Sequence, residues 1–281
     1  MITLSNMPRI GYKETLINSA DVVQKDMETN PLNFRQNELF LIAGPCAVES
    51  ENQLRTILTN ENRPTLIRGG IHKMRTNAKS FQGMGDEGLA IVSKLKKEIP
   101  FDFITEVTDA RQIETLLPMT SVFQIGARNM YNYELLKEIS RYNRPVILKR
   151  AFSATISEWL GSAEYLFNLG EKNIILCERG VRSFDNKLRN LLDLGSVIYL
   201  KKNTPFKIIV DPSHSMGFTP YVADAAYAAV AAGADGLMVE VHPEPACALS
   251  DGQQALNIQQ FNEMVLKLKK IAPLFEKELR M

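Results

Sequence analysis

The sequence has few cysteines and no long hydrophobic run. Its 281 residues include only Cys46, Cys177 and Cys247, which are too few and too widely spaced for a disulfide framework. No apolar segment reaches the roughly 18 residues of a membrane span, and residues 1–7 lack the basic segment and apolar core of a signal peptide. We therefore expect a cytoplasmic protein in which each cysteine is a core thiol, a nucleophile or a metal ligand.

Neither sign of charge dominates the chain. There are 33 Lys and Arg residues against 32 Asp and Glu, so the overall balance gives no reason to expect a nucleic-acid or acidic-membrane partner. Hydrophobic residues make up 45% of the sequence, enough to fill the core of a globular protein. A local concentration of basic residues therefore needs a local explanation.

From Leu39 onward, short apolar runs alternate with amphipathic segments of helical length. About eight such strand–helix units fit into roughly 240 residues, the size of a closed eight-stranded barrel. We therefore predict an α/β fold, a (β/α)8 TIM barrel over residues 39–281, preceded by a short N-terminal extension over residues 1–38. The predicted strands are 39–43, 65–68, 101–107, 122–125, 146–148, 173–176, 207–210 and 237–241. The predicted helices include 86–97, 110–117, 133–141, 155–169, 221–232 and 254–271.

A glycine-rich basic segment follows the second predicted strand. Residues 67–85 contain Arg68, Lys73, Arg75 and Lys79 together with several glycines. Glycines allow the backbone to approach a ligand closely, and the cations can donate charge-assisted hydrogen bonds to phosphate or carboxylate oxygens. The segment is therefore a candidate anion cradle. A solvated basic loop is the alternative, since most charged loop residues are simply hydrated.

Polar groups follow every predicted strand, at the end of the barrel where such folds carry their chemistry. In chain order they are Cys46 and Glu49; Arg68, Lys73, Arg75 and Thr76; Glu106; Gln124 and Arg128; Lys149 and Arg150; Glu178 and Arg179; Asp211 and His214; and Glu240, His242 and Asp251. Structural ion pairs can explain one or two of these groups but not the excess of cations. Because like charges converge only where anions neutralise them, the pattern predicts substrates that carry phosphate and carboxylate groups.

Four of these residues have the chemistry of metal ligands. Cys46, His214, Glu240 and Asp251 follow the first, seventh and eighth predicted strands, which become neighbours when the barrel closes. A mixed sulfur, nitrogen and oxygen set suits Mn, Fe, Co or Zn better than Ca or Mg. Alone, a cysteine or histidine here would be an ordinary core residue. Together the four predict one bound divalent metal ion, and the other two cysteines are assigned to packing.

Lys149 allows two interpretations. An amine at the mouth of a barrel can form a Schiff base with a carbonyl substrate, as in one class of aldolases. With Arg128, Arg150 and Arg179 expected nearby, a fixed positive charge for a phosphate group is the simpler role.

The motifs at these strand ends, taken in order, resemble a known family. They span residues 41–50, 68–76, 124–128, 147–150, 175–180, 211–214, 239–243 and 249–252. From about residue 39 to its end, the chain resembles the type I 3-deoxy-D-arabino-heptulosonate 7-phosphate (DAHP) synthases of the beta subfamily, which are related to 3-deoxy-D-manno-octulosonate 8-phosphate synthases.

The resemblance implies condensation of phosphoenolpyruvate with erythrose 4-phosphate, the first step of the shikimate route to aromatic amino acids. It implies that Cys46, His214, Glu240 and Asp251 bind the metal. Arg68, Lys73, Arg128, Lys149 and Arg179 match the phosphoenolpyruvate site, with Glu106 and Gln124 lining it, and Arg75 and Thr76 match the aldose-phosphate end. The group that accepts the proton of the attacking water is not assigned, and the candidates are Lys73, Glu106 and a metal-bound water. Because relatives commonly form dimers or tetramers, a homodimer or homotetramer is expected.

One departure from the family pattern concerns the acceptor sugar. The family's usual Lys-Pro-Arg-Thr occurs here as residues 73–76 with Met74 in place of proline, and methionine relaxes a loop that proline would stiffen. A related synthase acting on another aldose phosphate, such as arabinose 5-phosphate, is therefore the alternative. A further alternative is a non-catalytic barrel that binds phosphorylated metabolites, although such a protein would not need the four metal ligands. No fused regulatory domain is recognisable, so we do not expect feedback control within this chain.

Overall fold

The computed structural model describes residues 32, 35, 37–64, 66–171 and 173–281. The extension predicted for residues 1–38 therefore lies almost entirely outside the described residues, as does residue 65 at the predicted start of the second strand. Leu32 is described and is only 6% exposed, because it packs in the cluster of side chains that fills the inside of the barrel.

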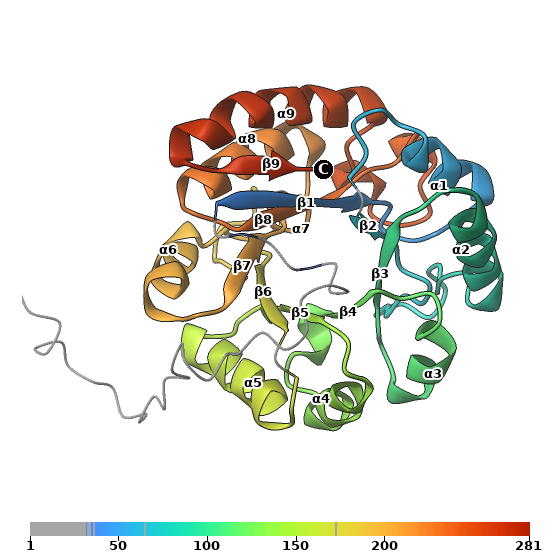
Figure 1. Cartoon of the computed structure of the whole chain (residues 1–281), viewed down its shortest axis with the longest axis horizontal. Helices are drawn as coiled ribbons and strands as arrows, with labels where there is room; N and C mark the ends of the chain where they lie inside the picture. The colour runs from blue at the N-terminus through green and yellow to red at the C-terminus, as the bar shows by residue number, and fades with distance from the viewer. Residues whose placement is uncertain (1–31, 33–34, 36, 65, 172) are drawn as a thin grey trace, which may run out of the picture.

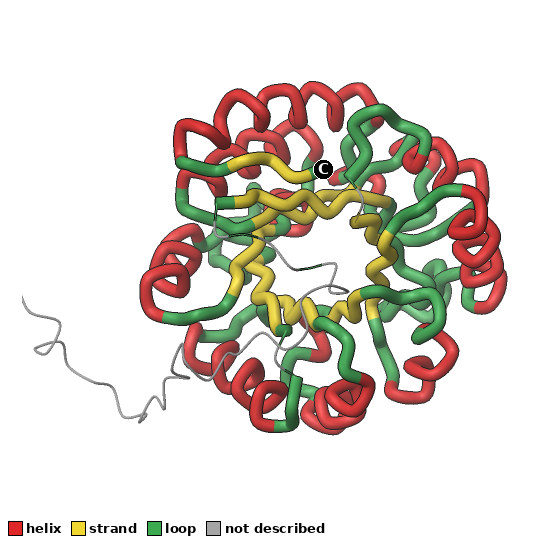
Figure 2. Tube along the Cα trace, in the orientation of Figure 1, coloured by secondary structure: helices red, strands yellow, loops and turns green. Residues whose placement is uncertain are grey.

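Eight parallel strands form a closed barrel with helices around its outside (Figures 1 and 2), which confirms the predicted (β/α)8 fold. The strands are β1 (Glu38–Gly44), β2 (Leu66–Arg68), β3 (Asp102–Glu106), β4 (Val122–Ile125), β5 (Val146–Lys149), β6 (Ile174–Glu178), β7 (Lys207–Val210) and β8 (Gly236–Glu240). A short ninth strand, β9 (Glu278–Arg280), pairs with the first residues of β1 and was not predicted. The eight predicted strands are all present, and their ends differ from prediction by one or two residues at most.

The helices lie between consecutive strands and pack against the barrel. They are α1 (Glu51–Leu58), α2 (Asp86–Glu98), α3 (Ile113–Leu116), α4 (Tyr133–Ile139), α5 (Ile156–Asn168), α6 (Leu194–Asn203), α7 (Pro212–Met216), α8 (Thr219–Ala231) and α9 (Ile258–Ile271). Short 3-10 turns are η2 (Ala110–Gln112), η3 (Ala127–Asn129), η4 (Ser140–Tyr142), η5 (Pro245–Cys247), η6 (Gly252–Gln254) and η7 (Ala272–Phe275). None of the described helices combines the length and the apolar character needed to cross a membrane.

Three predicted helices need correction. The helix predicted over 254–271 begins only at Ile258, because Asn257 caps it through reciprocal hydrogen bonds with Gln260. The helices predicted over 110–117 and 133–141 each combine a 3-10 turn with a shorter α-helix. Helices α1, α6 and α7 were not among those predicted; α6 exposes Ile198 and Tyr199, so its apolar residues do not mark one face.

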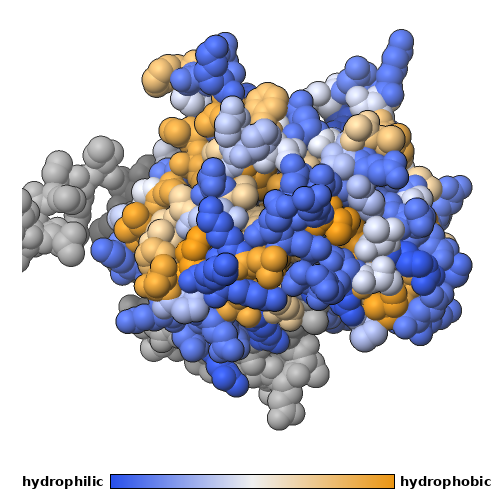
Figure 3. Space-filling model, turned by 90° about the horizontal axis from the view of Figure 1, so that it is seen from above, coloured by the Kyte–Doolittle hydropathy of each residue, from blue (hydrophilic) through white to orange (hydrophobic). Residues whose placement is uncertain are grey.

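Apolar side chains fill both sides of the strands. Ile104, Ile147 and Ile209 belong to the cluster inside the barrel, while Trp159 and Phe261 belong to the larger cluster between strands and helices. Burial on both faces explains why the strands are apolar throughout rather than alternating. The face of the molecule seen in Figure 3 is mainly hydrophilic with smaller hydrophobic patches. Most of the buried charged side chains, by contrast, lie at or directly after the carboxyl ends of the strands, as Arg68, Lys149 and Glu240 do.

The strand register brings the ends of β1, β2 and β8 together. Ala43 pairs with Ile67, and Gly44 pairs with Glu240. Beyond the strands, the Gly70 amide donates to the Cys46 carbonyl at 3.2 Å, so the loops after β1 and β2 remain in contact. This pairing holds Cys46 beside Arg68 and Glu240.

The close approach of β1 and β2 requires glycine at position 44. Gly44 has φ 151°, and a Cβ there would lie 2.1 Å from the Arg68 carbonyl oxygen. Gly170 also has a positive φ, 106°, but has open space around it.

We expect Gly170→Ala to lower the free energy of unfolding by about 1–3 kcal/mol through backbone strain alone. Gly44→Ala should cost more than about 4 kcal/mol, because the strands must also separate. Denaturant unfolding measures both, and equal losses would contradict the steric explanation.

Candidate active site

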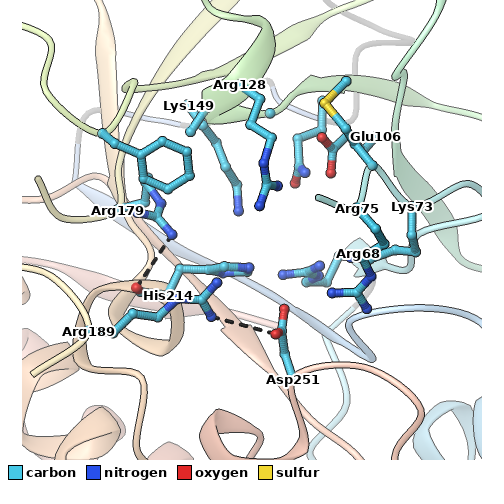
Figure 4. Close-up of a pocket in the computed structure, with 15 residues that line it drawn as sticks. Arg68, Lys73, Arg75, Glu106, Arg128, Lys149, Arg179, Arg189, His214 and Asp251 are labelled. Atoms are coloured by element: carbon cyan, nitrogen blue, oxygen red, sulfur yellow. Dashed lines mark hydrogen bonds and ion pairs between the residues drawn. The ribbon is translucent and has the colours of Figure 1, made fainter. Parts of the chain in front are cut away.

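A polar cavity opens at the carboxyl ends of the strands (Figure 4). Its lining includes most of the predicted substrate residues: Arg68, Lys73, Arg75, Glu106, Gln124, Arg128, Lys149 and Arg179, together with His214 and Asp251. Two members of the basic segment do not reach it, because Thr76 and Lys79 are exposed and do not line the cavity. The predicted anion cradle is therefore narrower than residues 67–85.

The four predicted metal ligands come together beside this cavity. One ligand atom each from Cys46, His214, Glu240 and Asp251 lies within 4.8 Å of the others. The Cys46 thiol donates to Asp251 Oδ2 at 3.2 Å, and His214 Nε2 lies 3.4 Å from Glu240 Oε1. This spacing suits a single ion.

The hydrogen bonding of Glu240 supports the same conclusion. Its carboxylate is fully buried, and Oε1 has no hydrogen-bond partner among the described residues. Arg68 Nη1 lies 3.1 Å from that oxygen, but the orientation of the two groups does not allow a hydrogen bond between them. The contact is therefore an ion pair only. A buried oxygen left in this way is costly unless another ligand reaches it. A cation held by the four residues would satisfy Glu240 Oε1.

Protonation of the other ligands also fits a metal site. Burial lowers the pKa of His214, outweighing the nearby Asp211 carboxylate, and favours the neutral imidazole that binds metals. Burial, reinforced by the Glu240 charge, raises the pKa of the Cys46 thiol to about 12. A thiol in this position remains protonated until a cation stabilises the thiolate.

Asp211 determines which nitrogen of His214 is available. The Asp211 carboxylate caps the five-residue helix α7 by accepting from the His214 backbone amide at 2.9 Å. Its Oδ2 lies 2.7 Å from His214 Nδ1 and accepts from Lys149 Nζ at 2.6 Å. Because Nδ1 donates to this carboxylate, Nε2 is free to face the ligand cluster.

The cations are only partly neutralised by the protein. Arg68 and Lys149 contact buried carboxylates, whereas Arg128 and Arg179 form no ion pair with any described residue and lie over the Phe152 ring. Arg179 is almost completely buried, and an unpaired guanidinium group shielded from water in this way attracts anions strongly, whereas Arg128 is exposed at the cavity. The cavity is therefore built to receive negatively charged groups.

Two other predicted groups have structural contacts instead. Arg150 is buried, donates to Glu178 and Asp193 at 2.9 Å and does not line the cavity. His242 lies 3.3 Å from Glu49 and is likewise outside it. These pairs stabilise the loops around the site.

Several residues of the site were not predicted, among them Phe152, which lines the cavity and lies against Arg128 and Arg179. Ser250 Oγ lies 3.1 Å from Cys46 Sγ and accepts a short hydrogen bond from Arg75. Arg189 lines the cavity, and Gln254 donates to Glu240. Ser250 lies in the motif at residues 249–252, but the sequence analysis assigned it no role. Arg189 lies in an irregular loop and Gln254 in a segment predicted to be helical, so neither followed a predicted strand end.

The fold and site together define a (β/α)8 barrel with a cationic cavity next to a cluster of four residues that could hold a metal ion. A family model described as the DAHP synthetase I family matches residues 23–277, and the chain belongs to that family. This confirms the resemblance drawn from the motifs.

Known proteins support the assignment. The phospho-2-dehydro-3-deoxyheptonate aldolase of Thermotoga maritima is 43% identical over 234 residues, which cover 83% of this chain and 69% of the relative. A crystal structure of the T. maritima DAHP synthase has 41% identity and a TM-score of 0.83, over 87% of this chain and 72% of that one. A truncated form of the T. maritima synthase has 39% identity and a TM-score of 0.80, over 87% and 90%. The 2-dehydro-3-deoxyphosphooctonate aldolase of Thiobacillus denitrificans is more distant, with 30% identity over 83% of this chain and 89% of the relative.

Replacing Asp211 tests the charge balance of the site. Asp211→Asn keeps the helix cap but leaves the Lys149 ammonium, whose side chain is only 5% exposed, without its counter-charge. We expect a loss of about 3 kcal/mol in the free energy of unfolding, since breaking a buried ion pair is strongly destabilising. Asp193→Asn is the matched control, because Arg150 retains Glu178. A loss no larger than that of the control would contradict the proposed balance.

Proposed function

We propose that the protein is a metal-dependent DAHP synthase that condenses phosphoenolpyruvate with erythrose 4-phosphate and water and releases phosphate. The observation that carries the proposal is the position of the cationic cavity directly beside the cluster of Cys46, His214, Glu240 and Asp251. Membership of the DAHP synthetase I family and 43% identity to a phospho-2-dehydro-3-deoxyheptonate aldolase support it.

Phosphoenolpyruvate carries a carboxylate and a phosphate, which match the unpaired cations. Arg128 and Arg179 would bind these groups together with Arg68, Lys73 and Lys149, while Gln124 adds an amide to the lining. Such fixed charges hold the substrate and stabilise charge that develops during reaction, without reorganising. The Lys149 ammonium is already bound to Asp211, which favours a fixed positive charge over the free amine that a Schiff base requires.

Cys46, His214, Glu240 and Asp251 would hold one divalent ion, Mn, Fe, Co or Zn. When bound, the ion would supply Lewis acidity that polarises the aldehyde of the sugar phosphate. Asp211 would keep the coordinating nitrogen of His214 free, and the low exposure of Cys46 and Glu240 would exclude bulk water.

In the reaction, C3 of phosphoenolpyruvate forms a bond to the aldehyde carbon, water adds at C2, and the C2–O bond to phosphate then breaks. Two side chains are candidates for exchanging a proton near C2. Glu106 faces the cavity, accepts no hydrogen bond from a described residue and packs against Gly126, where a Cβ would lie 2.0 Å from its Oε1. Lys73 Nζ donates to the Cys46 carbonyl at 3.2 Å and to Cys46 Sγ at 3.0 Å. Either group is positioned to act as a general acid or base.

Arg75 would bind the phosphate of the aldose. It lines the cavity, and its Nε donates to the Phe81 carbonyl at 3.2 Å, which fixes the guanidinium. Thr76, assigned to the same end by resemblance, would have to turn inward. A five-carbon acceptor is the second candidate, because the octonate aldolase of Thiobacillus denitrificans is also a relative.

The remaining proposals are the first step of the shikimate route and a homodimer or homotetramer, which rest on the family resemblance. A cytoplasmic location, and a division between an extension over residues 1–38 and the catalytic barrel over residues 39–281, rest on the sequence pattern.

Phosphate release with a panel of aldose phosphates tests the reaction. We expect metal-loaded protein to release phosphate from phosphoenolpyruvate only when an aldose phosphate is present, and fastest with erythrose 4-phosphate. Removing the metal with a chelator should abolish release, and adding Mn, Fe, Co or Zn should restore it. Faster release with arabinose 5-phosphate would favour the second acceptor, whereas no release with any aldose would refute the synthase.

The metal ligands can be tested with the other thiols of the chain as controls. Cys46→Ser replaces a soft ligand with a hydroxyl and should weaken metal binding by about 10–100-fold while leaving the fold intact. Cys247 is exposed, which corrects its assignment to packing, so Cys247→Ser should have no effect. Metal content after dialysis measures metal binding, and the circular dichroism spectrum reports whether the fold is intact. Unchanged metal content in Cys46→Ser would contradict its assignment as a ligand.

A further inference from the structure

Gln254 connects the ligand cluster to a cation in another loop. Its side chain is fully buried, and both ends of its amide are used. Nε2 donates to Glu240 Oε2 at 2.8 Å, and Oε1 accepts from Arg189 Nη1 at 2.5 Å. A buried amide with both ends bonded is fixed in one orientation.

Arg189 determines that orientation. A guanidinium can only donate, so the oxygen of the amide must face Arg189 and the NH2 group must face Glu240. The NH2 group of the amide therefore donates to Glu240 Oε2, and Oε1 is left with no hydrogen bond. Oε1 is the oxygen that lies near His214. The oxygen available to a metal is thus selected by Gln254.

Arg189 is itself held in place from a separate loop. Its backbone amide donates to the Met216 carbonyl at 3.2 Å, next to Gly217, where a Cβ would lie 2.4 Å from the Cβ of Arg189. Its Nη1 lies 3.7 Å from Asp251 Oδ1, a contact drawn in Figure 4. Asp251 directly precedes the 3-10 turn that contains Gln254. One guanidinium therefore contacts both a candidate ligand and the amide that orients another.

We infer that Gln254 is a positioning residue that presents Glu240 to the metal, and that Arg189 acts through it by fixing the orientation of the amide. The inference rests on the proposed metal site. Groups that orient metal ligands in this way typically change metal affinity by about 10–100-fold when they are replaced.

Direct titration of metal binding tests the inference. Gln254→Met preserves approximate size but removes both hydrogen bonds, and it should weaken the binding of Zn²⁺ and Mn²⁺ by about 10–100-fold in competition with a chromophoric chelator. The adjacent Gln253 is exposed, so Gln253→Met provides a matched control that should bind like the unmodified protein. At saturating metal, the KM for phosphoenolpyruvate should not change, because Gln254 does not line the cavity.

A double-mutant cycle that combines Arg189→Met with Gln254→Met tests the role of Arg189. The Arg189 side chain is 31% exposed, so Arg189→Met should fold normally. If it acts through Gln254, its effect on metal affinity should largely disappear in the Gln254→Met background. Fully multiplicative effects would show instead that Arg189 acts on Asp251 alone, and would overturn that half of the inference.

The outcomes separate this inference from the proposed function. If the unmodified protein binds metal through Cys46 and Gln254→Met binds it equally well, the positioning role is wrong while the metal site stands. If the unmodified protein binds no metal, or Cys46→Ser binds it normally, the metal site itself is wrong and the inference falls with it.

Discussion

The constraint on which the site depends is the cost of gathering like charges where water is largely excluded. Arg68, Lys149 and Arg179 are almost completely buried at the ends of three different strands. Closing the barrel makes those ends converge, so the fold itself creates the repulsion. The buried carboxylates of Asp211 and Glu240 offset part of it. The positive charge that remains favours bound anions, so a phosphorylated, carboxylated substrate would suit this cavity better than a neutral one.

The same need to balance buried charge explains how the candidate metal ligands are held. Three of the four reach a cation through one intervening polar side chain, and the three connections are His214–Asp211–Lys149, Glu240–Gln254–Arg189 and Cys46–Ser250–Arg75. Each intermediate fixes the ligand in one orientation and also anchors a positive group that faces the cavity. The candidate metal and anion sites thus share a framework of hydrogen bonds, and we expect a change in one site to alter the other.

Much of this could be predicted from sequence because a barrel converts position along a strand into position in space. A polar residue directly after an apolar strand must lie at the mouth, and Glu106, Lys149 and Glu240 were placed correctly for that reason. The rule fails where a side chain turns away from the mouth: Arg150 follows β5 but points to Glu178 and Asp193. Direction within a loop depends on hydrogen bonds to partners far along the chain, and periodicity contains no information about them.

The segment after β8 shows why the remaining residues escaped prediction. Gln254 precedes an amphipathic helix whose apolar pattern already begins at Leu256, yet the helix starts only at Ile258, where Asn257 provides a cap. Before that point Thr219 Oγ1 donates to the carbonyls of Gln253 and Ala255, and Asp251 has a positive φ of 53°. A continuous helix would not give Asp251 this left-handed backbone, nor leave those two carbonyls to Thr219. The irregular turn is therefore what places a carboxylate and an amide on the same cluster, at the expense of the regular pattern that sequence reasoning detects.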